Sequence, residues 1–470
     1  MTDLPSDPWK WTACQAVGAL KDRTIAPVEL IDAAVARIEA VDGPINALPI
    51  RCFGRAREQA SNEGLRDTPL AGLPIAVKDY NDVGGVRTTY GSPIFADNVP
   101  ARSDATVQRL EANGAIPIAK SNVPEWAGGH TFNPVNGLTR NPWNMERSAG
   151  GSSGGSAAAL ASGQIWLATG NDLGGSLRTP AAFNGVVGLR PSPGLVPRGR
   201  RHPAFDVLWV EGPMARNVAD VALMLDAGAG AHPDDPLAFT PAESFLQAAQ
   251  APRRPLRIGF SPDLGGAVPM AREIAAVAGD AMARLAGEAV DVKQSCPDFT
   301  GAFDAFQSLR GILLGAMMSE MLDEHRDRIS PDIASNVELG LAQTPETIFR
   351  AEQTRTRLSH AMTDFFADHD LLICPATSIP PFPVEQPFVT EIDGKACDTY
   401  IDWFAVTFLL TLTACPVLSL PCGLTADGLP VGLQIVGKPR GEADLLAAAA
   451  WMEQVFSFSE RVPLRGLPTT

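Results

Sequence analysis

Two short glycine- and serine-rich stretches constrain this chain more than any other part of its sequence. Residues 150–156 read Gly-Gly-Ser-Ser-Gly-Gly-Ser, and residues 174–176 read Gly-Gly-Ser. Glycine allows close backbone approach and unusual dihedral angles, so successive N–H groups can point into one cavity beside a serine hydroxyl. A helix-like alanine run at 157–161 follows the first stretch and argues against a flexible linker. The two stretches therefore predict a serine nucleophile with an oxyanion hole.

Composition and charge exclude several other classes of protein. The 470 residues are 45% hydrophobic and 19% charged, which provides a large core and excludes a disordered chain. The formal net charge of −15 disfavours both nucleic acid and anionic membranes as partners. The densest basic stretch, Arg198 to Arg201, is typical of a solvated turn. No Lys-Ser or Lys-Thr follows either glycine stretch at the spacing of a phosphate-binding loop, so nucleotide binding is also disfavoured.

Cysteine and histidine usage points to a cytoplasmic protein without a metal or cofactor. The seven cysteines include no C-x-x-C pair, and their odd number does not suggest a disulfide framework. The six histidines show neither H-x-H nor H-E-x-x-H spacing, so a metal site has no support in the sequence. The first ten residues are polar, and no run of about 18 apolar residues follows. We therefore expect a protein that is neither exported nor embedded in a membrane.

Hydrophobic periodicity predicts one α/β domain over residues 1–470. Residues 74–77 form an apolar run that is typical of a buried strand and ends at Lys78, and residues 116–120 repeat this pattern up to Lys120. Strands at 256–260 and 290–292 flank a predicted helix at 271–285, which indicates a βαβ unit. Residues 300–365 are mostly helical in pattern and form a predicted insertion. Further elements are predicted as helices at 27–41, 218–225 (capped by Asn217) and 442–455, and as strands at 371–374 and 431–436.

A nucleophilic serine needs a base, and the residues alone leave two arrangements open. Residues 151–155 match G-x-S-x-G, which would make Ser153 the nucleophile of an α/β-hydrolase with a histidine base. That motif requires a buried strand directly before it, whereas residues 144–149 are polar and are expected to be irregular. The alternative base is Lys78, because burial at the end of a strand disfavours the charged form of a lysine.

Seven ordered motifs extend over most of the chain, namely GLPIAVKD (72–79), KSNVPE (120–125), TRNPW (139–143), GGSSGGSAAA (150–159), GNDLGGSLR (170–178), GPMAR (212–216) and GLPVGLQIVG (428–437). With these motifs the chain resembles the amidase signature family. This resemblance implies a large mixed β-sheet flanked by helices, with a signature core at about residues 70–225 and a helical, substrate-covering insertion at about 300–365.

The resemblance also implies a Lys-Ser-Ser triad. Matching positions place the base at Lys78, a bridging serine with a cis peptide at Ser152, and the nucleophile at Ser176. Neutral Lys78 would then accept a proton through Ser152 while Ser176 attacks the amide carbonyl. The implied oxyanion hole is formed by the N–H groups of Leu173, Gly174, Gly175 and Ser176, and the implied supporting residues are Ser153, Asp172 and Arg178.

Four positions depart from the usual family pattern, namely Asn171, Asn184, Thr411 and Ala414. The asparagine at position 171 is similar to the pattern in the branch of the family that opens cyclic amide oligomers. Another branch is the A-type component of the tRNA-dependent amidotransferase, and Asp402 is at a position that could match the glutamine contact of that component. However, the three tyrosines of the chain lie outside 280–360, where the A-type component has a tyrosine contact, and the net charge of −15 suits tRNA poorly.

The prediction from these observations is an amidohydrolase that cleaves the C–N bond of a small apolar or aryl amide, linear or cyclic, through an acyl-enzyme on Ser176. The alternatives are an esterase that uses the same triad and an A-type amidotransferase component. The oligomeric state, including a homodimer, stays open. Trp126, His130, Phe132 and Met317 are the predicted pocket residues, with Asp402 as a further candidate.

Overall fold

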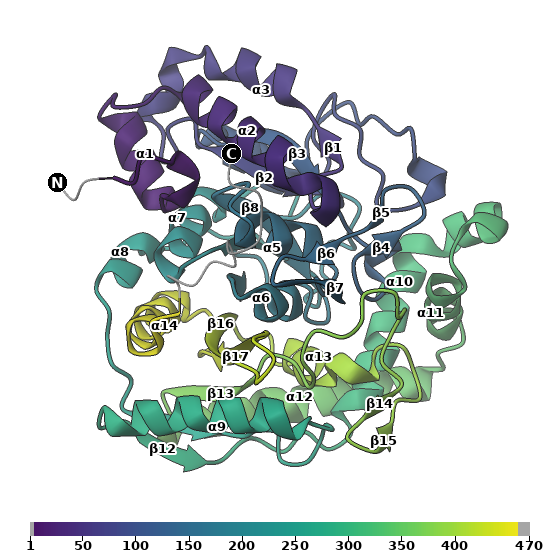
Figure 1. The fold of residues 1–470 in the computed structure, drawn as a ribbon. Coiled ribbons are helices and arrows are strands. Elements are labelled where there is room, and N and C mark those ends of the chain that lie inside the picture. The colour runs from purple at the N-terminus through teal and green to yellow at the C-terminus, as the bar shows by residue number, and fades with distance from the viewer. Residues whose placement is uncertain (1–3, 459–470) are drawn as a thin grey trace.

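The computed structural model describes residues 4–458, and over these residues one sheet of eleven strands runs through the molecule (Figure 1). The strand order is β1-β3-β2-β8-β10-β9-β16-β17-β13-β11-β12. Strands β3, β2 and β8 are parallel, as are β13, β11 and β12, whereas the pairs between β8 and β13 are antiparallel. This mixed sheet flanked by helices confirms the predicted single-domain α/β fold.

The strands of the large sheet are β1 (Ile50–Arg51), β2 (Pro74–Lys78), β3 (Ile116–Ser121), β8 (Leu167–Asp172), β9 (Val187–Arg190), β10 (Val210–Ala215), β11 (Arg257–Phe260), β12 (Asp291–Gln294), β13 (Leu371–Pro375), β16 (Val417–Leu424) and β17 (Pro430–Val436). The short hairpin strands are β4 (Phe132–Asn133), β5 (Gly137–Leu138), β6 (Arg140–Asn141), β7 (Asn144–Ser148), β14 (Glu391–Ile392) and β15 (Lys395–Ala396).

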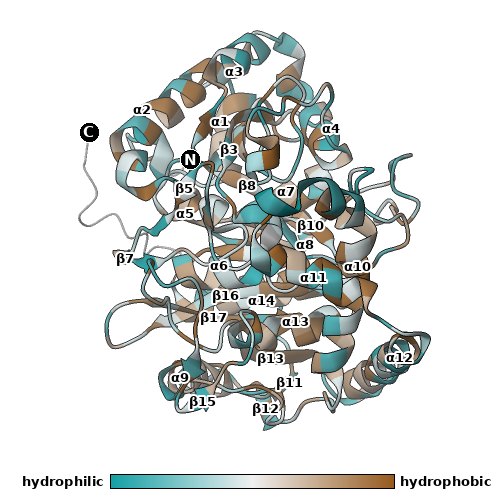
Figure 2. Cartoon of the chain, turned by 90° about the vertical axis from the view of Figure 1, so that its right-hand side faces the viewer, coloured by the Kyte–Doolittle hydropathy of each residue, from teal (hydrophilic) through white to brown (hydrophobic). Residues whose placement is uncertain are grey.

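The helices are α1 (Ala13–Lys21), α2 (Pro27–Ile45), α3 (Phe53–Ala60), α4 (Ala105–Ala112), α5 (Gly154–Ala161), α6 (Arg178–Asn184), α7 (Val218–Gly228), α8 (Phe245–Gln250), α9 (Arg272–Gly287), α10 (Ala302–His325), α11 (Pro331–Leu341), α12 (Pro345–Asp368), α13 (Ala405–Thr411) and α14 (Glu442–Phe456). Hydrophilic and hydrophobic residues alternate along α2 and α12, as expected for helices with one buried and one exposed face (Figure 2).

The parallel strands β2, β3 and β8 place the site. Every residue of each of these strands is buried, which explains the continuous apolar runs at 74–77 in β2 and 116–119 in β3. Because the three strands are parallel, their carboxyl ends lie at one edge of the sheet, where ligands of α/β proteins commonly bind. That edge brings together Lys78 at the end of β2, Lys120 near the end of β3, and Asp172 at the end of β8.

Several predicted elements agree with the structure, and two details differ. The βαβ unit is present, because β11 and β12 are parallel and α9 lies between them in the chain. Asn217 caps α7 by accepting a hydrogen bond from the Asp220 N–H. Helix α2 continues to Ile45, beyond its predicted end at residue 41. Residues 144–148 form strand β7 rather than an irregular segment, but this strand pairs with β6 outside the central sheet.

The region between residues 302 and 368 is helical, as predicted, and borders the same edge of the sheet. Helix α10 packs along α11 and α12 and also contacts α13. Its first turns bring Phe306 and Arg310 to a pocket beside the loop that follows β8. Within the described residues, no helix is long and apolar enough to cross a membrane.

Candidate active site

Lys78 lies fully buried at the end of β2, with uncharged hydrogen-bond partners. Its Nζ donates to Ser152 Oγ at 2.7 Å and to Asn171 Oδ1 at 2.6 Å. Burial disfavours the ammonium form and lowers the pKa of Lys78 well below its usual value, although Glu211 and Asp172 oppose this shift. An amine of lowered pKa beside a serine hydroxyl is suited to accept a proton from that hydroxyl.

Lys120 provides a contrast at the neighbouring strand. Its Nζ lies 3.0 Å from Asp79 Oδ1 and donates to Thr88 Oγ1 at 2.8 Å. Both charged side chains are completely buried, and the Asp79 carboxylate compensates the ammonium charge. Of the two strand-end lysines, only Lys120 has a paired carboxylate within residues 4–458, so the two amines lie in different electrostatic environments.

Ser152 lies between the lysine and the pocket. The Gly151–Ser152 peptide bond is cis, as the family resemblance implied. A side chain at residue 151 would not fit, because a Cβ there would lie 2.2 Å from the Gly129 carbonyl oxygen. The glycine of the first stretch therefore lets the backbone pass close to Gly129 and brings the Ser152 hydroxyl to Lys78.

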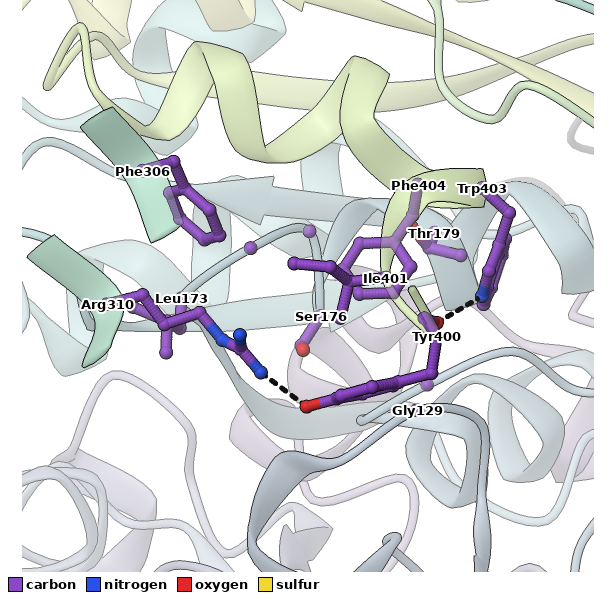
Figure 3. Close-up of a pocket in the computed structure, with 13 residues that line it drawn as sticks. Gly129, Leu173, Ser176, Thr179, Phe306, Arg310, Tyr400, Ile401, Trp403 and Phe404 are labelled. Carbon is purple, nitrogen blue, oxygen red and sulfur yellow. Dashed lines mark hydrogen bonds between the residues drawn. The ribbon is translucent and has the colours of Figure 1, made fainter. Parts of the chain in front are cut away.

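Ser176 follows β8 on a tight loop and borders the pocket drawn in Figure 3. Its carbonyl oxygen accepts a hydrogen bond from the Ser153 N–H at 3.3 Å, which joins the two glycine- and serine-rich stretches. Gly175 has a φ of 124°, and a Cβ there would lie 2.2 Å from Thr407 Oγ1. The sharp turn before the nucleophile candidate thus requires glycine for its dihedral angle and for space.

Asp172 holds the loop that precedes Ser176. Its carboxylate accepts hydrogen bonds from the N–H groups of Gly175 at 2.9 Å and Leu177 at 3.2 Å. Burial alone would raise the pKa of Asp172, but Arg178 and Arg190 hold that pKa well below its usual range. The Gly175 N–H is engaged by this carboxylate. Of the four N–H groups predicted for the oxyanion hole, those of Leu173, Gly174 and Ser176 remain as candidates.

Arg178 connects this loop to the C-terminal half of the chain. It binds the Asp172 carboxylate through Nε at 3.0 Å and Nη2 at 2.9 Å. Its Nη1 donates to the Thr407 carbonyl oxygen and to Gln434 Oε1, both at 2.7 Å. Thr407 Oγ1 in turn donates to the Gly174 carbonyl oxygen at 2.7 Å. Helix α13 and strand β17 therefore hold the backbone on both sides of Ser176.

Three of the four departures from the family pattern have a contact near these loops. Asn171 accepts the hydrogen bond from Lys78, and Thr411 Oγ1 accepts one from Arg178 Nη2 at 3.0 Å. Asn184 Nδ2 donates to the carbonyl oxygens of Ala149 and Pro180, both at 2.8 Å, and so supports the segment before the cis peptide. Ala414 has a φ of 56°, and nothing in the structure explains this substitution.

The predicted pocket residues do not share one cavity. Trp126 and Met317 line a second pocket, where Trp126 stacks on Tyr90 with ring centroids 5.1 Å apart. Phe132 is 54% exposed, and His130 is buried against Phe382. The pocket next to Ser176 is lined instead by Gly129, Gly151, Leu173, Gly174, Gly175, Thr179, Phe306, Arg310, Tyr400, Ile401, Trp403 and Phe404.

Asp402, the remaining predicted pocket residue, is occupied within its own loop. Its carboxylate accepts hydrogen bonds from the N–H groups of Asp398 at 2.7 Å and Thr399 at 3.0 Å, and from the Thr399 hydroxyl. The lining of the pocket next to Ser176 includes its neighbours Ile401 and Trp403 but not Asp402.

Arg310 and Tyr400 are pocket residues that the sequence analysis did not select. The guanidinium of Arg310 donates to the Tyr400 hydroxyl, and both side chains border the pocket together with Ser176 (Figure 3). The sequence held a signal for Arg310, because it is the one charged residue in the mostly apolar range 305–314. Tyr400 lies in an irregular segment and carried no comparable signal.

Known proteins share this fold and these motifs. The sequence model of the Amidase family matches residues 29–446. An acylamidase of Rhodococcus erythropolis is 34% identical over 97% of this chain and 98% of its own length. The A-type component of the glutamyl-tRNA(Gln) amidotransferase of Anaeromyxobacter dehalogenans is 35% identical over 94% of this chain and 95% of its own length.

Among solved structures, a bacterial aryl acylamidase of the amidase signature enzymes superimposes with a TM-score of 0.89. It is 29% identical, and the alignment covers 98% of this chain and 99% of the other. Together with the fold and the family match, this similarity confirms the resemblance found in the sequence. The chain belongs to the amidase signature family.

Proposed function

We propose that this protein hydrolyses amides through an acyl-enzyme on Ser176, with Ser152 as the proton relay and Lys78 as the base. The observation that carries this proposal is the fully buried Lys78 amine, which lies 2.7 Å from Ser152 Oγ and has no carboxylate partner within the described residues. Lys78 takes the Ser152 proton while Ser152 takes the proton of Ser176. The amine product then leaves with a proton returned along the same relay, and water hydrolyses the acyl-enzyme.

As Ser176 attacks, negative charge develops on the carbonyl oxygen of the substrate, and hydrogen-bond donors that are already in position stabilise this charge. The N–H groups of Leu173, Gly174 and Ser176 are the candidates, and Asp172 and Thr407 hold the loop that carries them. A single donor in such a site typically contributes about 3 to 4 kcal/mol to transition-state stabilisation. Asp172, Arg178 and Ser153 therefore serve as supporting residues that position the backbone rather than touch the substrate.

The proposed substrate is a small amide with an apolar or aryl portion. Apolar and aromatic side chains dominate the pocket wall next to Ser176, including Leu173, Phe306, Trp403 and Phe404. The acylamidase and aryl acylamidase among the similar proteins support the same substrate class. Helix α10 supplies Phe306, so the region at about 300–365 covers the substrate in this proposal.

An A-type amidotransferase component is the second candidate, because one such protein is as similar in sequence as the acylamidase. The position of Asp402 favours the amidase, since its carboxylate already accepts hydrogen bonds from its own loop. In this proposal the chain acts in the cytoplasm on small molecules, as a monomer or a homodimer. The net charge of −15 disfavours nucleic acid as a partner. An esterase activity of the same triad is a third outcome that the assay below separates.

The test uses the purified full-length chain without a partner protein or tRNA. Hydrolysis is measured with the wild type, Ser176→Ala and Ser153→Ala on a panel of anilides, aliphatic and cyclic amides and matched esters. The assay follows the amino group that each amide yields and the alcohol that each ester yields. We expect Ser176→Ala to abolish turnover and a sulfonyl fluoride to label Ser176. Labelling of Ser153 would contradict the relay, and activity only with tRNA and added partner proteins would support the amidotransferase. Ester turnover without amide turnover would make the protein an esterase.

A further inference from the structure

Arg310 places a positive charge in the pocket wall next to Ser176. Its side chain extends from α10 and the residue is only 8% exposed. Its Nη1 donates to Gln307 Oε1 at 3.2 Å, and its Nη2 donates to the Tyr400 hydroxyl. Within residues 4–458, no carboxylate oxygen lies within the 4.0 Å ion-pair distance of the guanidinium. A buried guanidinium with only neutral partners is costly unless an anion joins it.

Tyr400 extends this donor group. Its hydroxyl oxygen accepts hydrogen bonds from Arg310 and from Asn336 Nδ2, the latter at 2.5 Å. A phenol oxygen that accepts two hydrogen bonds still has its own proton to donate. The Trp403 indole also donates to the Tyr400 carbonyl oxygen at 3.0 Å, which fixes the segment that carries the ring. Arg310 and Tyr400 together therefore present N–H and O–H donors to the pocket.

The N–H and O–H donors of Arg310 and Tyr400 lie in a pocket wall that is otherwise largely apolar. Phe306, Ile401 and Phe404 contribute apolar surface to the same wall, and the side chain of Leu173 lies at the catalytic loop. Figure 3 shows Arg310, Tyr400 and Ser176 around one space. Three of the five N–H groups of the guanidinium are not used by the two hydrogen bonds above. A planar, bidentate acceptor such as a carboxylate matches that geometry.

We propose that Arg310, supported by Tyr400, binds a carboxylate on the substrate, so that the preferred substrate is an amide with an apolar portion and an anionic end. This inference rests on the proposed function, because it concerns the pocket of the same nucleophile. Arg310 acts as a specificity-determining residue: it holds the anionic end of the substrate while the amide carbonyl lies at Ser176. The apolar wall then contacts the portion between these two groups.

The experiment compares substrates that differ only in the anionic group. Hexanoyl anilide and adipic acid monoanilide form one pair, with the carboxylate on the acyl side. Hexanoyl anilide and 4-(hexanoylamino)benzoate form a second pair, with the carboxylate on the amine side. We expect the wild type to favour the acid in one pair by at least about tenfold in kcat/KM, and that pair identifies the side that Arg310 contacts.

The variants are Arg310→Met, Arg310→Lys and, as a matched control, Arg350→Met on the exposed face of α12. Hydrogen bonds to charged groups are commonly equivalent to a factor of about 10 to 150. We therefore expect Arg310→Met to lower the acid-to-neutral ratio of kcat/KM by a factor in this range. Arg310→Lys retains the charge without the planar fork and should recover part of the ratio. Arg350→Met should leave the ratio unchanged.

A second measurement needs no variant, in case Arg310→Met fails to fold. The inhibitors match the pair that the wild type favours: adipate and hexanamide for the acyl side, 4-aminobenzoate and aniline for the amine side. The acid should inhibit competitively and at least about tenfold more strongly than its neutral counterpart. The inference is overturned if the wild type favours neither acid, if the matching acid inhibits no better than its neutral counterpart, or if Arg310→Met leaves the ratio unchanged. Turnover of the neutral anilide that depends on Ser176 would still support the proposed function, so the two failures are distinguishable.

Discussion

Replacing Lys78 by methionine tests whether this lysine is neutral in the folded protein. Burial lowers its pKa in the folded state, so the unfolded chain binds the proton up to a pKa of about 10.4 while the folded chain has released it. Wild-type stability therefore rises with pH between these two pKa values, by about 1.4 kcal/mol per pH unit. Lys78→Met has no such proton to lose and lacks this dependence.

The magnitude follows from the two unfolding reactions. If Lys78 is neutral at pH 7, releasing its proton costs the folded wild type about 4 to 5 kcal/mol, a cost that is absent from the variant. The variant loses the hydrogen bonds to Ser152 and Asn171, at roughly 1 to 3 kcal/mol for each acceptor left unpaired. That loss is the same at each pH. The stability of Lys78→Met relative to the wild type should therefore fall by about 2.7 kcal/mol between pH 7 and pH 9.

The assay is urea unfolding of both proteins at pH 7 and pH 9, followed by tryptophan fluorescence. Lys120→Met is the matched control, because it removes an equally buried lysine but leaves the Asp79 carboxylate without its partner. We expect this control to lose about 3 to 5 kcal/mol at both pH values. If the difference between the wild type and Lys78→Met is the same at pH 7 and pH 9, Lys78 is protonated in the folded protein and cannot be the base.

Three further predictions concern the same region. kcat/KM should rise with pH through the lowered pKa of Lys78, and Asn171→Asp should move that rise to higher pH because its carboxylate favours the ammonium form. Gly175→Ala should lower kcat at least about 100-fold in steady-state assays, since its Cβ would meet Thr407 at a φ of 124°. His130 has its pKa lowered by burial to about 4, so stability should fall by roughly 3 kcal/mol as the pH drops from about 6.5 to 4. His130→Phe should flatten that part of a thermal-unfolding pH series.

Each of these predictions has an outcome that contradicts it. A pH–rate rise that does not move in Asn171→Asp would mean that another group titrates. Gly279→Ala in α9 is the control for Gly175→Ala, because nothing lies within 4 Å of its Cβ position, and we expect it to retain activity. Equal loss in both glycine variants would refute the steric argument. An unchanged acid limb in His130→Phe would assign that limb to the carboxylates.

The sequence predicted the elements whose signal is local. The buried apolar runs of β2 and β3, the amphipathic pattern of α2 and the Asn217 cap of α7 are properties of neighbouring residues. The motifs also identified the family. The two strand-end lysines could not be separated in this way, because both follow an apolar run. Asp79 follows Lys78 directly in the chain, in the turn after β2, yet it pairs with Lys120 of the neighbouring strand.

The pocket depends on contacts between distant parts of the chain, which local patterns do not encode. Arg178 and Thr407 are 229 residues apart in the sequence, and Arg310 and Tyr400 are 90 apart. Met317 was a predicted pocket residue, but it lines the second pocket with Trp126. The absence of a carboxylate near Arg310 in the described residues could be recognised only once the side chains around it were placed.

The hydrogen bonds from Arg178 to Thr407 and Gln434 have a consequence for biosynthesis. Lys78, Ser152 and Ser176 all lie within the first two-fifths of the chain. The elements that support the loop around Ser176, α13 and β17, are synthesised close to the end of translation. A nascent chain, or a fragment that ends before α13, therefore contains all three residues of the proposed triad without these supporting contacts. We therefore expect hydrolytic activity to begin only when synthesis is almost finished.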